Sequence, residues 1–197
     1  MRRTTRLLAV IALLSGCSGE PTATGPGADV GPDAAGNRLA NKPSTSESAA
    51  SVQKDLATLR QVTARFHRFE AATNAGWSTK ITPCMTDPAG GMGFHYGNTA
   101  LIDAVANVAE PELLLYEPEK NGRLRLVAVE YIIPYTLHAR DAAPPVLFGR
   151  EFLQNDAFQL WGLHAWVWKH NPSGMFANWN PTVSCKYTTD VLAMAHN

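Results

Sequence analysis

The sequence has no excess charge of either sign and no long apolar run. It carries 17 Lys and Arg residues against 17 Asp and Glu residues, so it offers no electrostatic footprint for nucleic acid. The longest apolar run, "LLAVIALL" at residues 7–14, is too short to cross a bilayer core of about 30 Å as a helix. These absences argue against a nucleic-acid-binding protein and against a helical membrane-spanning protein.

The common catalytic motifs are also missing. The sequence contains no GxSxG nucleophile elbow, no HExxH zinc motif, no CxxCH haem motif and no GxGxxG dinucleotide fingerprint. It therefore indicates no reaction class, and whether the protein is an enzyme stays open.

Cysteine is scarce, at three residues, and the first ends a patterned N-terminus. Arg2, Arg3 and Arg6 precede the apolar run, and "LSGC" follows it up to Cys17. This pattern resembles a bacterial lipoprotein signal with its lipobox. The resemblance implies a signal peptide at 1–16, palmitate or a similar lipid on Cys17, and an exported protein anchored to a bacterial membrane, facing the periplasm or the cell exterior. An ordinary secretory signal is the alternative, and the export route, Sec or twin-arginine, stays open.

The other two cysteines, Cys84 and Cys185, are expected to form a disulfide in such an oxidising location. The bridge would close a loop of about 100 residues, which the chain-entropy model values at about 4 to 5 kcal/mol. Free thiols or metal ligands are the alternatives, although the CxxC spacing of many zinc sites is missing.

The composition divides the chain into a tether and a domain. Residues 17–46 are dominated by Gly, Pro, Ala, Ser and Thr and contain no aromatic residue, as expected for a lipidated cysteine followed by a flexible tether. Residues 47–197 are long enough for a single globular domain with its own core.

The domain is predicted to be α+β. Apolar residues recur every three or four positions from Val52 to Phe69, which predicts an N-terminal amphipathic helix with Ser48 or Ser51 as its cap and Gly76 at its end. Strands are predicted in "PELLLYEP", "RLRLVAVEYIIP" and "FQLWGLHAWVW". We expect an antiparallel sheet of about four to six strands with the helix packed on one face.

Three connecting segments are also predicted. "TALIDAVANV" indicates a short helix that begins near Asn98 or Thr99. Asn121 and Gly122 favour a tight hairpin turn in which both residues have positive φ. The breaker-rich stretch at 135–155 is expected to be a long loop that covers part of the domain.

One stretch, "LHAWVWKHNPSGMF", places polar and aromatic side chains on one strand face. His164, Trp166, Trp168 and His170 share one parity, and the strand is expected to end at Pro172. Both faces are largely apolar, so a histidine here must find a partner or stay neutral.

Two further segments supply candidate site residues. Glu130 interrupts an apolar strand and is therefore buried or open to a cavity, and His95 lies in the glycine-rich "GMGFHYGN", where the backbone can approach a ligand closely. We expect a ligand pocket formed by His95, Tyr96, Glu130, His164 and Trp166.

The same residues can form a metal site. Imidazole and carboxylate groups from His95, His164, His170 and Glu130 suit a transition metal such as zinc or copper, and Met92 and Met175 lie near two of these histidines in sequence and would favour copper. His164 and His170 are about 20 Å apart along a straight strand, so both can bind one ion only if the chain bends between them. A hydrogen-bonded structural network without metal is the alternative.

The strings "GMGFHYGN", "GRLRLVAVEYIIP", "LHAWVWKHNPSGMFANWNP" and "VSC" occur in this order over about residues 55–185. This signature resembles a family of uncharacterised exported bacterial proteins. The resemblance implies one domain and carries no activity to transfer.

These observations together predict a membrane-anchored extracytoplasmic lipoprotein that binds an unknown small molecule. The alternatives are a metal-binding protein or metalloenzyme that uses His95 and His164, and an envelope protein-interaction module whose buried polar residues only organise the core. The membrane, through the lipid on Cys17, is the partner that the sequence indicates, and no nucleic acid is expected.

Overall fold

The structure is a computed structural model that describes residues 49–194. The expected signal peptide at 1–16, the lipidated Cys17 and the tether up to residue 46 lie outside the described residues. Within residues 49–194, no helix is long and apolar enough to cross a membrane.

The N-terminal helical segment is broken into three pieces. Helix α2 spans Ala49–Thr63, a 3-10 turn η1 spans Ala64–His67, and helix α3 spans Phe69–Asn74. Arg68 has an extended backbone, which interrupts the single helix that the periodicity predicts. Gly76, with φ of 111°, ends the segment as expected. Ser51 lies inside α2 rather than at its cap, and Ser48 falls outside the described residues.

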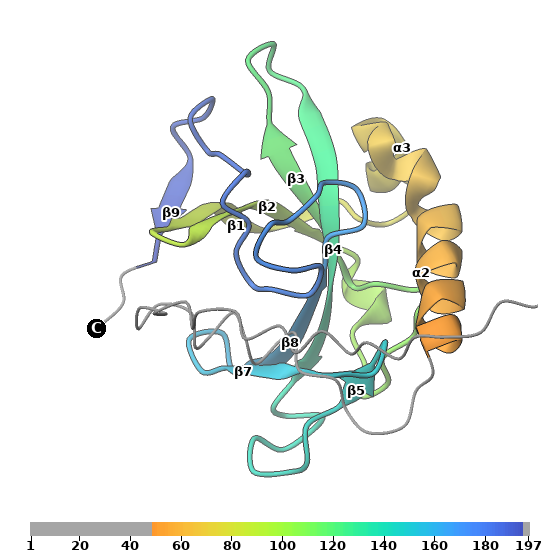
Figure 1. The fold of residues 1–197 in the computed structure, drawn as a ribbon. Coiled ribbons are helices and arrows are strands. Elements are labelled where there is room, and N and C mark those ends of the chain that lie inside the picture. Colours follow the sequence, from red (N-terminus) through yellow and green to blue (C-terminus); the bar gives the residue numbers. More distant parts are fainter. Residues whose placement is uncertain (1–48, 195–197) are drawn as a thin grey trace, which may run out of the picture. The chain divides into compact units, whose positions relative to one another are not determined.

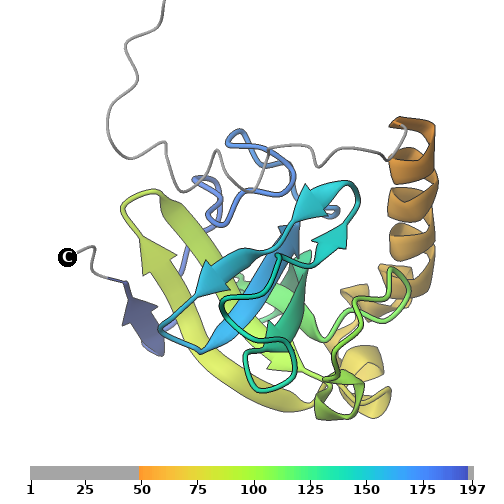
Figure 2. The ribbon, with the colours of Figure 1, turned by 90° about the horizontal axis from the view of Figure 1, so that it is seen from below.

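The sheet is larger than predicted and is mixed. Seven strands follow in the order β7-β8-β4-β3-β2-β1-β9, and all neighbours are antiparallel except β1 and β9, which are parallel. Figures 1 and 2 show how strongly this sheet curls. The strands are β1 Thr79–Asp87, β2 Gly90–Gly97, β3 Leu113–Pro118, β4 Leu124–Pro134, β7 Leu153–Asn155, β8 Leu160–Ala165 and β9 Val191–Ala193. The α+β class is therefore confirmed, whereas the purely antiparallel sheet of four to six strands is wrong.

The connections also differ from the prediction in part. The stretch at 135–155 carries the two-stranded sheet of β5 (Val146–Leu147) and β6 (Arg150–Glu151), as well as β7. The predicted helix after Asn98 is a single 3-10 turn, η2 (Thr99–Leu101), in which the Asn98 side chain accepts a hydrogen bond from the Ala100 amide.

Both faces of the sheet are packed, and they have different partners. One face carries Leu114, Tyr131 and Leu163 and packs against the helical segment through Leu56 and other buried residues; α2 and α3 lie along this side in Figure 1. The opposite face carries Leu113, Leu115, Ala128 and Ile132 and packs with Met85, Met92 and Trp166. Burial on both faces explains why the strands are apolar on both parities.

Two irregularities set which side chains face this second side. The β3–β4 turn is a three-residue loop in which only Gly122 has positive φ, at 78°, so the two-residue turn predicted for Asn121 and Gly122 is wrong. Leu115 pairs with Ala128 and Tyr116 pairs with Leu126, so Val127 is the extra residue of a β-bulge. Beyond the bulge, Leu113 pairs with Glu130. Glu130 thus shares a face with Ala128 and Ile132 but not with Leu126.

Strand β8 ends at Ala165, five residues earlier than the pattern through His170 suggests. The Trp166 amide donates to the Met175 carbonyl, and the Val167 amide donates to the Ala165 carbonyl, so the chain bends away from the sheet. His170 consequently lies outside the strand and is exposed.

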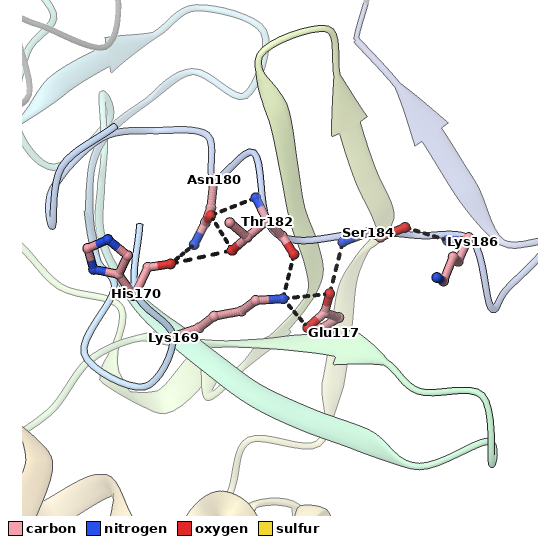
Figure 3. Close-up of polar contacts among 7 residues, drawn as sticks. All are labelled: Glu117, Lys169, His170, Asn180, Thr182, Ser184 and Lys186. Atoms are coloured by element: carbon pink, nitrogen blue, oxygen red, sulfur yellow. Dashed lines mark hydrogen bonds and ion pairs between the residues drawn. The ribbon is translucent and has the colours of Figure 1, made fainter. Parts of the chain in front are cut away.

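The segment after β8 is fastened to the sheet at several points. Cys84 in β1 and Cys185 form the predicted disulfide, and β9 pairs with β1. The Lys169 ammonium donates to the Glu117 carboxylate on β3 and to the Thr182 carbonyl, while the Ser184 amide donates to Glu117 (Figure 3). These contacts hold residues 166–194, here called the C-terminal segment, against the sheet.

Candidate metal and ligand site

Three of the predicted polar residues meet on the second face of the sheet. The register pairs Glu130 of β4 with His164 of β8, and it pairs His95 of β2 with Leu115 of β3. Leu115 in turn pairs with Ala128, which shares a face with Glu130. Because directly paired residues point to the same face, the side chains of His95, Glu130 and His164 all project to one side of the sheet. One ligand atom from each lies within 4.8 Å of the other two, and all three residues are buried.

The distances within this cluster suit a shared ion better than direct hydrogen bonds. Glu130 Oε2 lies 3.4 Å from His95 Nε2 and 3.7 Å from His164 Nε2. Both are long for hydrogen bonds of this type. They are close to the roughly 3.3 Å that separates two ligand atoms on a tetrahedral ion with bonds of about 2.0 to 2.1 Å.

Burial disfavours the charged form of each of the three side chains. Burial lowers the pKa of His95 to about 3, and His164 adds to this effect. Burial also lowers the pKa of His164 to about 4, opposed by the nearby Asn178 side chain. Burial raises the pKa of Glu130 to about 8, with a smaller contribution from Glu112. The two histidines are therefore neutral, which is the form that binds metals.

The two histidines differ in their outer contacts. Thr82 of β1 places its Oγ1 atom 2.8 Å from His95 Nδ1, which leaves Nε2 turned toward Glu130. Such a contact fixes the ring orientation of a metal-ligating histidine. Neither nitrogen of the His164 ring has a hydrogen bond of good geometry, although Asn178 lies close enough to influence its pKa. A buried imidazole in this state is costly and needs an explanation.

Two cavities adjoin the cluster. The first, called the apolar cavity, has a volume of about 50 Å³, and its lining consists of Ile81, Thr82, Met85, Met92, His95, Leu113, Glu130, Ile132, Asn155, Phe158, Leu160 and His164. The second, called the polar cavity, has a volume of about 350 Å³, and its lining consists of Met85, Met92, Glu130, Leu153, Gln154, Asn155, Asp156, Gly162, His164, Asn178, Trp179 and Met194. Both share Glu130, His164, Met85, Met92 and Asn155, so the cluster is reached from two directions.

The remaining predicted site residues lie elsewhere. Trp166 is buried and holds its ring nearly parallel to His164, with centroids 6.1 Å apart, and its indole donates to the Ala177 carbonyl. Tyr96 faces the helical side of the sheet, where its ring contacts Phe69. His170 is exposed and outside the cluster.

The structure adds residues that the sequence did not single out. Thr82 and Met85 lie on β1, which was not predicted as a strand, and Asn178 belongs to the C-terminal segment. The sequence "TPCM" at residues 82–85 does not predict the contact of Thr82 with His95, because the pairing of β1 with β2 is irregular between Thr82 and Met85. Of the two methionines considered for copper, Met92 lines both cavities, whereas Met175 packs on the core of the helical side.

Comparison of the chain with protein-family models, with curated proteins and with solved structures finds no match.

Proposed function

We propose that this domain binds one transition-metal ion through His95, Glu130 and His164, and that the ion is the centre of a small-ligand site. The observation that carries the proposal is the approach of two neutral imidazoles and one carboxyl group to within 4.8 Å of one another inside the protein. An ion between them would give the His164 ring a partner of good geometry, and its positive charge would stabilise the ionised form of the buried Glu130 carboxylate.

Copper or zinc fits these donors. Two nitrogens and one oxygen are ligands that both metals accept, and three protein ligands leave a coordination position for water or a small molecule. The thioethers of Met85 and Met92 line both cavities beside the cluster, and these soft donors favour copper over zinc.

The proposed location is extracytoplasmic, with the protein held at a bacterial membrane by lipid on Cys17. The lipobox pattern supports this proposal, and a disulfide between Cys84 and Cys185 suits an oxidising compartment.

The test is elemental analysis of the full chain, purified in detergent without chelator and without a histidine tag. We expect about one metal ion per chain, or uptake of one ion on incubation with copper or zinc, and loss of that ion in His164→Ala. The matched control is His170→Ala, which removes an exposed histidine outside the cluster and should keep the ion.

A parent protein that takes up neither copper nor zinc would contradict the proposal, as would a folded His164→Ala variant that keeps its metal. In that case the buried polar residues would serve a metal-free ligand pocket or only the core of an interaction module.

A further inference from the structure

The two cavities beside the cluster offer different chemistry. In the apolar cavity, the polar side chains are Thr82, Asn155 and the three cluster residues, and the others are apolar. A ligand that fills this cavity therefore meets polar groups at the cluster end and carbon or sulfur atoms over most of its remaining surface. Such a lining is typical of a site that orients a mainly apolar molecule by a few polar contacts.

The mouth of the apolar cavity is also apolar. Ile81 on β1 and Phe158 in the β7–β8 connection both line the cavity, and they are 40 % and 38 % exposed. Large apolar side chains left in solvent beside a cavity are stabilised when a ligand covers them. The apolar path thus continues from the cluster to the protein surface.

The lining contains no cation to bind an anionic group. Among the residues that line either cavity there is no Lys and no Arg, and the ionisable ones are His95, Glu130, His164 and Asp156. The residues that line the two cavities offer no ion-pair partner for a carboxylate or phosphate, so a ligand head group bound there would depend on the metal ion.

We infer that the metal centre takes a molecule with one metal-ligating head group and a short alkyl chain, with the head on the ion and the chain in the apolar cavity toward Ile81 and Phe158. This inference rests on the proposed function. The volume of about 50 Å³ admits only a few heavy atoms inside the protein. A longer chain passes between Ile81 and Phe158 into solvent.

The polar cavity has a separate role in this arrangement. Asn155 lines both cavities, and Asn178 and Gln154 line the polar one, so amide groups are available to a substituent on the head group or to water that enters from this side. The head group would therefore lie between an apolar lining on one side and a more polar lining on the other.

The test uses the full chain loaded with Cu²⁺ or Co²⁺ and a series of straight-chain alkyl hydroxamic acids with two to eight carbons. Metal content is measured first by elemental analysis, and binding is then followed by the visible absorption of the ion. We expect the affinity to rise about two- to fourfold per methylene over the first carbons and then to level off, as apolar burial predicts for a short cavity with an open mouth.

Two variants test where the alkyl chain of the ligand lies. Ile81→Asn and Phe158→Ser change exposed side chains at the mouth and should reduce the dependence on chain length without changing metal content. Val105→Asn is the matched control, because Val105 is an exposed apolar residue that lines neither cavity.

The outcomes separate the two proposals. If the protein binds metal, and its affinity for hydroxamates is the same at every chain length, this inference is wrong and the proposed metal site is unaffected. A chain-length dependence that both mouth variants retain overturns the placement of the chain. A protein that takes up no metal overturns the proposed function, and this inference with it.

Discussion

Gly162 makes the space in which the Glu130 carboxylate lies. The two residues are on neighbouring strands, and a Cβ atom at position 162 would lie 2.9 Å from Glu130 Oε1. The atom in conflict is the end of a side chain rather than backbone, so Glu130 can rotate away at little cost to the fold. The Glu130 carboxylate thus has room because β8 carries a glycine at position 162.

Gly162→Ala is expected to separate metal binding from stability. The added methyl group displaces the carboxylate from the two imidazoles, so metal affinity should fall about tenfold or more, while the melting temperature stays near that of the parent. Isothermal titration with Cu²⁺ or Zn²⁺ measures the first quantity, and thermal denaturation of the metal-free protein measures the second. Unchanged metal affinity in a folded variant would show that Glu130 is not a ligand.

Thr82 is expected to act on the metal through His95. Thr82→Val keeps the shape of the side chain and removes the oxygen that lies 2.8 Å from His95 Nδ1, so the ring loses the contact that orients it. Loss of such an outer contact costs about 10- to 100-fold in metal affinity. Thr82→Ser retains the hydroxyl and should bind metal nearly as well as the parent. Equal losses in both variants would point to packing rather than to the hydrogen bond.

The contribution of Glu112 to the stability of the metal-free protein should fall as the pH rises. Glu112 is buried and its side chain accepts a hydrogen bond from the Ile132 amide, and burial raises its pKa from 4.5 to about 8. Between these values the unfolded chain releases a proton that the folded chain keeps. The contribution of Glu112 is therefore fully present below about pH 4.5 and is lost progressively up to about pH 8, by at most about 1.4 kcal/mol per pH unit.

Urea denaturation at several pH values between 5 and 8 measures this dependence. Glu112→Gln keeps an acceptor for the Ile132 amide without a titrating group, so it should remove one negative contribution and make the slope of stability against pH less negative. The exposed Glu151 provides the control, since Glu151→Gln should leave the slope as it is. A slope that is the same in Glu112→Gln and in the parent would show that Glu112 ionises at an ordinary pKa.

Two ion pairs of opposite exposure should differ in their effect on stability. Lys169 and Glu117 are 2.7 Å apart and largely buried, whereas Arg140 and Asp156 form an exposed pair at the same distance. Lys169→Met leaves the Glu117 carboxylate buried without its cation and should lower the free energy of unfolding by about 2 to 4 kcal/mol. Arg140→Met should leave the melting temperature close to that of the parent, because solvent screens the exposed pair. Similar melting temperatures for both variants would contradict a structural role for Lys169.

The sequence predicted the composition of the site better than its geometry. Glu130 and His164 could be found because a polar residue within an apolar strand requires a reason, and His95 because it lies among glycines. Leu113 pairs with Glu130 through a three-residue turn and a bulge at Val127, and no pattern in the sequence predicts either irregularity.

The predicted reach of the "LHAWVWKH" strand was wrong for a related reason. Alternation alone assigned His170 to the face of His164, yet the Trp166 amide is bonded to Met175, and the strand ends there. The competing partner comes from a later part of the chain, which local periodicity cannot reveal. Thr82 and Asn178 were missed for the same reason, since their contacts with the cluster depend on long-range pairing.

The disulfide makes completion of the site depend on a step that follows synthesis of the C-terminal segment. Cys84 immediately precedes Met85, which lines both cavities, and Cys185 lies between Trp179 and Met194, which line the polar cavity. The bond joins residues separated by 101 positions, so it can form only after Cys185 has been synthesised. Before thiol oxidation, no covalent link holds the C-terminal wall of the polar cavity to β1. The compartment that supplies the oxidant thus also determines where this covalent link forms.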